Sequence, residues 1–161
     1  MIPRICFMFG TRNAQEKEYQ KIYDAVETCI AEGVNDFIVG RYGNFDSMAL
    51  RAVIQAKRLH PHVHLEILTP YYSPNACDNP LPPGVNGWAF AGGTEEVPPR
   101  FAIVQANRHM VKNVEYIIAG VYHRMGNSYK LLRHVRAFCA RSEYPPRVLC
   151  TGITLDECVK N

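Results

Sequence analysis

The sequence contains few of the patterns by which protein classes are usually assigned. Lysine and arginine occur without a basic run, no apolar segment approaches the roughly 20 residues that a membrane span requires, and none of the six cysteines forms a CxxC pair. The net charge is only +3, which does not favour nucleic acid as a partner. These absences argue against a membrane protein, a zinc ribbon or finger, and a nucleic-acid-binding stripe.

The composition is that of one ordinary globular domain. The chain has 161 residues, of which 47% are hydrophobic and 20% charged, and we expect a single domain over residues 1–161. The first residues, MIPRICFMFG, lack a small-residue cleavage site and continue as an apolar run, so they predict a core strand and not a signal peptide. We therefore expect a cytoplasmic protein whose cysteines stay reduced and serve as small apolar side chains.

Apolar runs and helical periodicities alternate along the chain. The runs predict strands at residues 4–10, 36–40, 62–70, 115–121 and 147–150. Apolar residues at spacings of three and four predict helices at residues 13–33, 45–59, 99–113 and 128–141. This alternation indicates βαβ units, so we expect the α/β class: a Rossmann-like three-layer sandwich around a mostly parallel sheet of about five strands.

Two segments fall outside this alternation. Residues 71–98 hold many of the prolines and glycines and the only tryptophan, Trp88. An irregular segment of this length inside a compact domain is often functional, so we interpret it as a lid-like insertion, with a plain surface excursion as the alternative. Residues 151–161 are expected to form a peripheral tail.

Three predicted turns carry glycine where a strand leads into a helix: GTRN at 10–13, GRYGNFD at 40–46 and HRMGNS at 123–128. In a parallel sheet these turns share the carboxyl edge, where ligands bind. Glycine allows close backbone approach, and a helix start offers free N–H groups, so the combination suits a phosphate. Each turn alone can be a simple chain reversal, because the spacing is neither GxGxxG nor a Walker loop. Three on one edge favour a nucleotide-sized ligand.

The turn at 40–46 leads to the most detailed expectation. We expect the backbone N–H groups of Gly43, Asn44 and Phe45 to face an anion, and Gly43 to be hard to replace because a Cβ would occupy the space that a phosphate needs. Asp46 is an awkward neighbour for a phosphate. It fits better as a helix cap or as an acceptor from a sugar hydroxyl.

Other polar and aromatic residues allow two interpretations. Tyr42 and Tyr71 follow strand ends and could stack on a base, although tyrosines there also serve simple packing. His60, His62 and His64 alternate in HPHVH and could share a strand face, but no clustered acidic or thiol partner is evident in the sequence. The prediction is therefore no metal and no cofactor.

Three segments resemble the SLOG superfamily, a Rossmann-like group that includes the DNA-processing-A-like and lonely-guy-like families. They are CFMFGTR, FIVGRYGNFDSMALRAVIQAKRLHPHVHLEILTPYY and AIVQANRHMVKNVEYIIAGV, and the resemblance extends from residue 4 to about residue 140. It is greatest to small bacterial members that carry GHR after the first strand and GGYGGFD after the second. In this chain Thr11 stands where those members have histidine, and Arg41 stands where they have the second glycine of a pair.

The resemblance implies a nucleotide or nucleotide-derived ligand held by the glycine loop, with Arg12 and Arg108 close by. Together with the turns it gives the predicted ligand-binding set: Gly10, Thr11, Arg12, Gly40, Arg41, Tyr42, Gly43, Asn44, Asp46, Tyr71, Arg108, Gly126 and Asn127. Arg108 has two simpler alternatives, a surface cation or a partner of Asp46. No catalytic residue is assigned.

The enzymatic branch of the resemblance lacks its glutamate. Lonely-guy-like phosphoribohydrolases carry PGGxGTxxE after the fourth strand, and the matching turn here is HRMGNSYKLL. If Ser128 takes the place of the threonine, the glutamate position falls on Leu131, beside Lys130. Neither side chain can accept a proton or stabilise an oxocarbenium ion at neutral pH.

Three hypotheses follow. The first, which the missing glutamate favours, is a non-catalytic binder or sensor of a nucleotide or nucleotide-derived ligand. The second is an N-glycosidic hydrolase or transferase acting on nucleosides or nucleotides, phosphoribohydrolase-like or deoxyribosyltransferase-like, which would need Asp46, Glu95 or Glu96. The third is an assembly module whose pocket is vestigial. Assembly into a homo-oligomer stays open in each case.

Overall fold

The computed structural model describes residues 4–70, 80–91 and 97–158. Its elements are, in chain order, β1 (Ile5–Gly10), a 3-10 turn η1 (Glu16–Glu18), α1 (Tyr19–Ala31), β2 (Asp36–Val39), α2 (Asn44–Lys57), β3 (His64–Thr69), β4 (Gly87–Phe90), α3 (Pro99–Asn113), β5 (Tyr116–Gly120), α4 (Gly126–Arg141) and β6 (Arg147–Cys150). Within the described part of the chain, no helix combines the length and the apolar character that crossing a bilayer requires.

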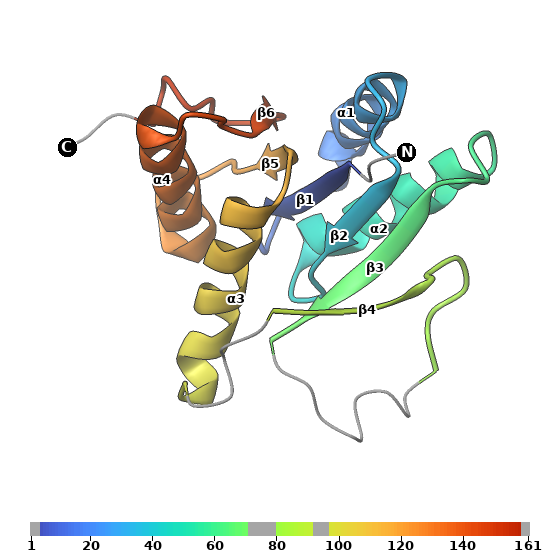
Figure 1. Cartoon of the computed structure of the whole chain (residues 1–161), viewed down its shortest axis with the longest axis horizontal. Helices are drawn as coiled ribbons and strands as arrows, with labels where there is room; N and C mark the ends of the chain where they lie inside the picture. Colours follow the sequence, from blue (N-terminus) through green and yellow to red (C-terminus); the bar gives the residue numbers. More distant parts are fainter. Residues whose placement is uncertain (1–3, 71–79, 92–96, 159–161) are drawn as a thin grey trace.

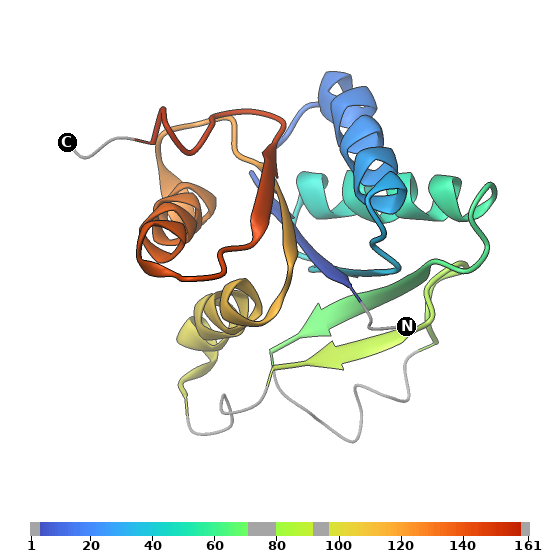
Figure 2. The same ribbon diagram turned by 45° about the horizontal axis from the view of Figure 1, so that its top comes forward.

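The strands form one sheet between two pairs of helices. The strand order is β4-β3-β2-β1-β5-β6, and every pairing is parallel. Helices α1 and α2 cover one face of the sheet, and α3 and α4 cover the other (Figures 1 and 2). The α/β class and the Rossmann-like three-layer sandwich are therefore confirmed, with six strands instead of about five.

Both faces of the central strands are buried, which explains their continuous apolar runs. In β1, Cys6 and Met8 belong to the core beneath α1 and α2, whereas Phe7 and Phe9 belong to the core beneath α3 and α4. All five residues of β5 are buried. Side chains of a strand alternate between its faces, so one apolar run supplies both cores.

The order of the strands places the ligand edge. From β1 the chain adds β2, β3 and β4 in succession on one side, and then returns to add β5 and β6 on the other side of β1. The loops that follow β1 and β5 therefore lead to helices on opposite faces, and a crevice opens between them at the carboxyl ends of the strands.

The first helix and the segment 71–98 differ from the predictions by more than a residue or two at an element's end. The first helix begins at Tyr19, after a 3-10 turn, because the backbone of residues 11–14 bonds to neighbouring loops instead. The segment 71–98 contains an edge strand, β4, which the sequence analysis missed because GWAF is short and does not alternate. The lid interpretation concerns mainly residues 71–79 and 92–96, which lie outside the described residues.

The segment after β6 is also packed more closely than a peripheral tail. The N–H groups of Thr151 and Ile153 donate to the carbonyls of Ala119 and Val121, at 3.0 and 2.8 Å. The side chain of Cys158 is buried in the core beneath α3 and α4. The described part of the tail therefore extends the sheet edge and closes this core.

Candidate functional site

A cavity of about 640 Å³ lies at the carboxyl edge of the sheet, where the turns after β1, β2 and β5 meet. This volume is typical of small-molecule sites. Apolar residues of the sheet, of α3 and of α4 form much of its wall: Phe7, Phe9, Leu68, Ile103, Ala106 and Leu131. Polar and charged residues also line it: Arg12, Asn13, Asp46, Asn107, His123, Asn127 and Ser128. The arrangement offers an apolar surface together with a few polar groups.

Most of the predicted ligand-binding residues line this cavity. They are Gly10, Thr11, Arg12, Gly40, Tyr42, Gly43, Asp46, Gly126 and Asn127. Residues from three separate turns thus come together, as the shared edge of a parallel sheet predicts. Tyr71 lies outside the described residues.

The structure does not bring Arg41, Asn44 or Arg108 to the cavity. The guanidinium of Arg41 lies 5.3 Å from the centre of the Trp88 ring, as a cation–π contact. The amide of Asn44 donates to the carbonyl of Ala14 at 3.3 Å. Arg108 is exposed on α3. The pKa of His134, on α4, is lowered first by the burial of His134 and second by the charge of Arg108. Arg108 is not among the residues that line the cavity.

The glycine turn after β2 is filled by the turn after β1. The N–H of Asn44 donates to the carbonyl of Arg12 at 2.7 Å, so the expectation that it faces an anion is wrong. Gly43 has an extended backbone, with φ of −171°, which any residue can adopt. A Cβ at Gly43 would lie 2.6 Å from Cα and 2.9 Å from the carbonyl oxygen of Arg12. The close backbone of Arg12 is therefore enough to require glycine at this position.

Asp46 supplies a carboxylate to the cavity, the only one among the described residues that line it. It does not cap α2, whose N-cap is Gly43. Its Oδ2 instead accepts from the N–H of Tyr42 at 3.0 Å. Burial raises the pKa of Asp46 to about 6, although the Tyr42 N–H and the charge of Arg12 both lower it. A carboxyl group that is partly protonated near neutral pH can exchange hydrogen bonds with a hydroxyl, but it disfavours a phosphate beside it.

The glycine turn after β5 is open. Gly126 has φ of +87°, a conformation that favours glycine, and a Cβ there would meet no atom within 4 Å. The first turn of α4 contains no acidic residue, and no side chain caps it. Its early N–H groups have no partner within the helix, and Asn127 and Ser128 of this turn line the cavity. This helix start is therefore suited to an anion.

Thr11, in the turn after β1, joins this turn to the turn after β5. It is buried, with 6% of its surface exposed. Its N–H donates to the carbonyl of Gly120 at 2.9 Å, and its Oγ1 accepts from the N–H of Tyr122, also at 2.9 Å. Gly10, just before it, packs against the ring of Phe45, which leaves no room for a Cβ. Both residues line the cavity, but their contacts explain them as structural.

Several polar residues of the cavity were not among the predicted ones. Asn107 lies four residues after Ile103, so the helical period places both on one face of α3, whereas Arg108 falls outside it. His123 and Ser128 belong to the turn HRMGNS, from which the predicted set contains only Gly126 and Asn127. Leu131, at the position where the lonely-guy-like turn would carry glutamate, does line the cavity.

No model of a known protein family matches the chain, and no curated protein matches it. The resemblance to the SLOG superfamily therefore stays a prediction from the sequence.

Proposed function

We propose that the chain binds a nucleotide or a nucleotide-derived ligand in this cavity, with the phosphate at the start of α4 and a sugar hydroxyl at Asp46. The observation that carries the proposal is the chemical difference between two parts of one cavity. The part at the start of α4 has an open helix end without acidic residues. The part beside α2 has the carboxyl group of Asp46, whose pKa is raised.

The phosphate position follows from the two helix starts that border the cavity. At α2, the N–H of Asn44 is already bonded, and Asp46 adds negative charge. At α4, Gly126 leaves open space, and the helix dipole and free N–H groups favour an anion. Arg12 also lines the cavity, and its guanidinium can form a charge-assisted hydrogen bond with a phosphate.

The remainder of the ligand is assigned by the same reasoning. Ile103, Ala106 and Leu131 offer apolar surface on which a flat base gains free energy by burial. Asp46 can accept a hydrogen bond from a ribose hydroxyl, as the sequence analysis considered. The resemblance to the SLOG superfamily agrees with this ligand class and belongs to the proposal, as does a cytoplasmic location.

The proposal is tested with matched nucleoside and nucleoside 5′-monophosphate pairs, and with ADP-ribose relatives, by thermal shift and calorimetry. We expect each monophosphate to bind more tightly than its nucleoside, because only the monophosphate reaches the α4 helix start. The stabilisation should grow with ligand concentration as binding to the folded state requires. Equal binding of both members of every pair, or no binding of either, would contradict the proposal.

A second candidate function rests on Asp46 alone. As the cavity's carboxylate, it could attack C1′ of a nucleoside, so that the N-glycosidic bond breaks and the base leaves with the bonding electrons and takes up a proton. Water would then release the sugar from the carboxylate. Chromatography measures the release of free base. Release by the wild type that is lost in Asp46→Asn would favour the N-glycosidic enzyme over the non-catalytic nucleotide binder. Glu95 and Glu96, the other carboxylates considered for this role, lie outside the described residues.

A further inference from the structure

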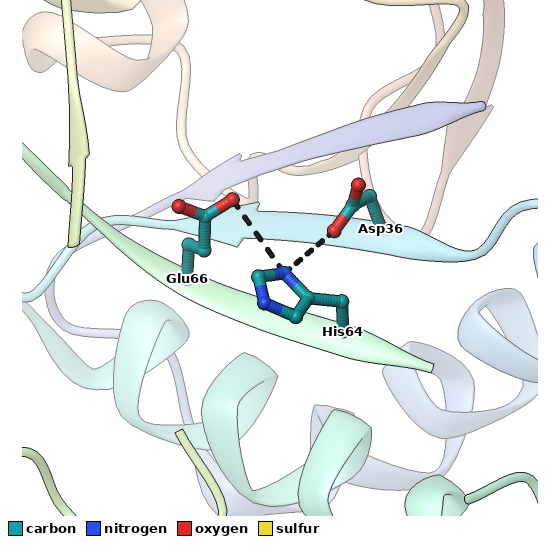
Figure 3. Close-up of side chains that lie close together, drawn as sticks. All are labelled: Asp36, His64 and Glu66. Carbon is teal, nitrogen blue, oxygen red and sulfur yellow. Dashed lines mark hydrogen bonds and ion pairs between the residues drawn. The ribbon is translucent and has the colours of Figure 1, made fainter. Parts of the chain in front are cut away.

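Three side chains with metal-binding groups meet at the opposite, amino-terminal edge of the sheet. Asp36 and His64 are the first residues of β2 and β3, and the register pairs them directly. Glu66 follows His64 by two residues, so it lies on the same face of β3. Figure 3 shows the three side chains pointing toward one another from the two strands.

The distances resemble those around a metal ion. The Nδ1 atom of His64 lies 2.8 Å from Oδ1 of Asp36 and 3.6 Å from Oε1 of Glu66. The three ligand atoms all lie within 4.8 Å of one another. Ligand atoms at about 2.1 Å from a zinc ion are separated by about 3.4 Å in a tetrahedral arrangement. Small rotations of the two carboxylates would therefore produce that geometry without moving either strand.

Charge and exposure also fit a cation. Two carboxylates and a neutral imidazole carry a charge of −2, and within the described residues neither carboxylate forms an ion pair with lysine or arginine. The side chains of Asp36 and Glu66 are 25% and 27% exposed, and that of His64 is 46% exposed. An ion can thus enter, and water can complete its coordination.

We propose that Asp36, His64 and Glu66 form a binding site for a divalent transition-metal ion, with zinc as the ion that fits best. An imidazole nitrogen with two carboxylate oxygens suits zinc better than magnesium or calcium, which prefer oxygen ligands throughout. Three protein ligands leave at least one position for water. The site lies at the other end of the strands from the ligand cavity and does not depend on the proposed function.

The HPHVH segment supplies a comparison within the same protein. His64 is separate from the other two histidines, because it turns to Asp36 and Glu66. The rings of His60 and His62 lie edge to face, and Nε2 of His60 lies 3.0 Å from Oε2 of Glu27. The His60–Glu27 pair thus has one carboxylate, and the His64 group has two. The partner that the sequence analysis did not recognise, Glu66, stands only two residues after His64.

The test is calorimetric titration of zinc into chelator-treated protein at pH 7.5, with thermal unfolding as a second readout. We expect one ion to bind and the unfolding temperature to rise, since zinc binds the folded arrangement. His64→Asn, Asp36→Asn and Glu66→Gln should each weaken binding by about tenfold or more, since even outer-shell changes weaken metal sites by about 10–100-fold. His60→Asn, the matched control, should leave the affinity unchanged.

Cobalt distinguishes this site from binding by the free cysteines. The nitrogen and oxygen ligands should give cobalt spectra without the intense near-ultraviolet band of thiolate ligands. Far-ultraviolet circular dichroism shows whether each variant is folded. If Asp36→Asn does not fold, Glu66→Gln takes its place in the test. Absence of zinc binding, a thiolate band, or equal affinity in His64→Asn would overturn the proposal and leave the three residues as a hydrogen-bonded ion group. Tighter magnesium or calcium binding that His64→Asn does not change would also overturn it.

Discussion

The glycine turns before α2 and α4 are alike in sequence and opposite in structure. Each follows a buried strand, contains glycine and asparagine, and opens a helix beside the cavity. At Gly43 the space is taken by the backbone of Arg12, whereas at Gly126 a Cβ would meet nothing within 4 Å. The first turn of α2 carries Asp46, and the first turn of α4 carries no acid.

A glycine in such a turn therefore has at least two separate physical causes. Gly43 has an ordinary extended backbone and is required by a neighbouring loop. Gly126 has a positive φ and is favoured by its own conformation. Only the second arrangement leaves a helix start open to a ligand, so the motif alone does not locate a phosphate.

Replacing each glycine with alanine should give the largest effect and separate the two causes. We expect Gly43→Ala to lower the free energy of unfolding by about 3 kcal/mol, because the Cβ would overlap the Arg12 backbone. Gly126→Ala should lower it by about 1 kcal/mol, the cost of a left-handed conformation in open space. Denaturant unfolding measures both. Equal losses at the two positions would show that the turns do not differ in this way.

The contact of Thr11, in the turn after β1, with the turn after β5 should have the next largest effect. Thr11→Val keeps the shape of the side chain but removes the acceptor of the partly buried Tyr122 N–H. We expect a loss of about 2 kcal/mol in the free energy of unfolding, because this donor would be left unsatisfied. The conservative Thr11→Ser keeps the oxygen and serves as the control. If valine and serine variants unfold at the same denaturant concentration, Thr11 does not hold the turns together.

A charge at the start of α4 should affect the ligand more than the fold. Asn127→Asp should weaken binding of a nucleoside monophosphate by about tenfold, while binding of the matching nucleoside changes little. An acidic residue is favourable in a first helical turn, so the variant should fold. Gln55→Glu, which makes the same charge change at an exposed position of α2, is the control for calorimetry. Equal effects of the two variants would place the phosphate elsewhere.

The fold was predictable from the sequence because the buried parallel strands and amphipathic helices each have a strong period. The segments PRFAIVQANRHMVKN and RVLC have the bounds that the sequence predicts. The edge strand β4 was not predictable by the same means. Its four residues are only partly buried, and their apolar run is too short and has no alternation to indicate a strand.

The site was predictable to the level of turns and not of single contacts. Sharing one edge of the sheet is a property of topology, so Arg12, Asp46 and Asn127 could be placed together from the sequence. Which N–H groups remain free depends on how neighbouring loops pack, and nothing in the sequence shows that Arg12 bonds to Asn44. Arg108 was expected at the ligand only because of the resemblance, whereas the helical period places Asn107 on the same face of α3 as Ile103.

The smallest expected effect concerns the pH dependence that Asp46 gives to the first turn. Its pKa is about 6 in the folded protein against 3.8 for an ordinary aspartate. The folded state therefore binds more protons than the unfolded state between these values, and the free energy of unfolding falls as pH rises through that window.

Asp46→Asn removes this term and keeps an oxygen that can accept from the Tyr42 N–H. We expect the variant to be more stable than the wild type by about 1 kcal/mol above pH 6, because part of the roughly 1.4 kcal/mol per pKa unit is offset by a weaker hydrogen bond. Near pH 4, where Asp46 of the folded wild type is protonated, the variant should have lost this advantage. Denaturant unfolding at a series of pH values measures the difference, with Asp156→Asn, an exposed position, as the control.

A variant less stable than the wild type at pH 7.5 would mean that the charge of Asp46 supports the fold. Greater stability in the variant would instead mean that this carboxylate is kept at a cost to folding, as expected of a group that serves a ligand.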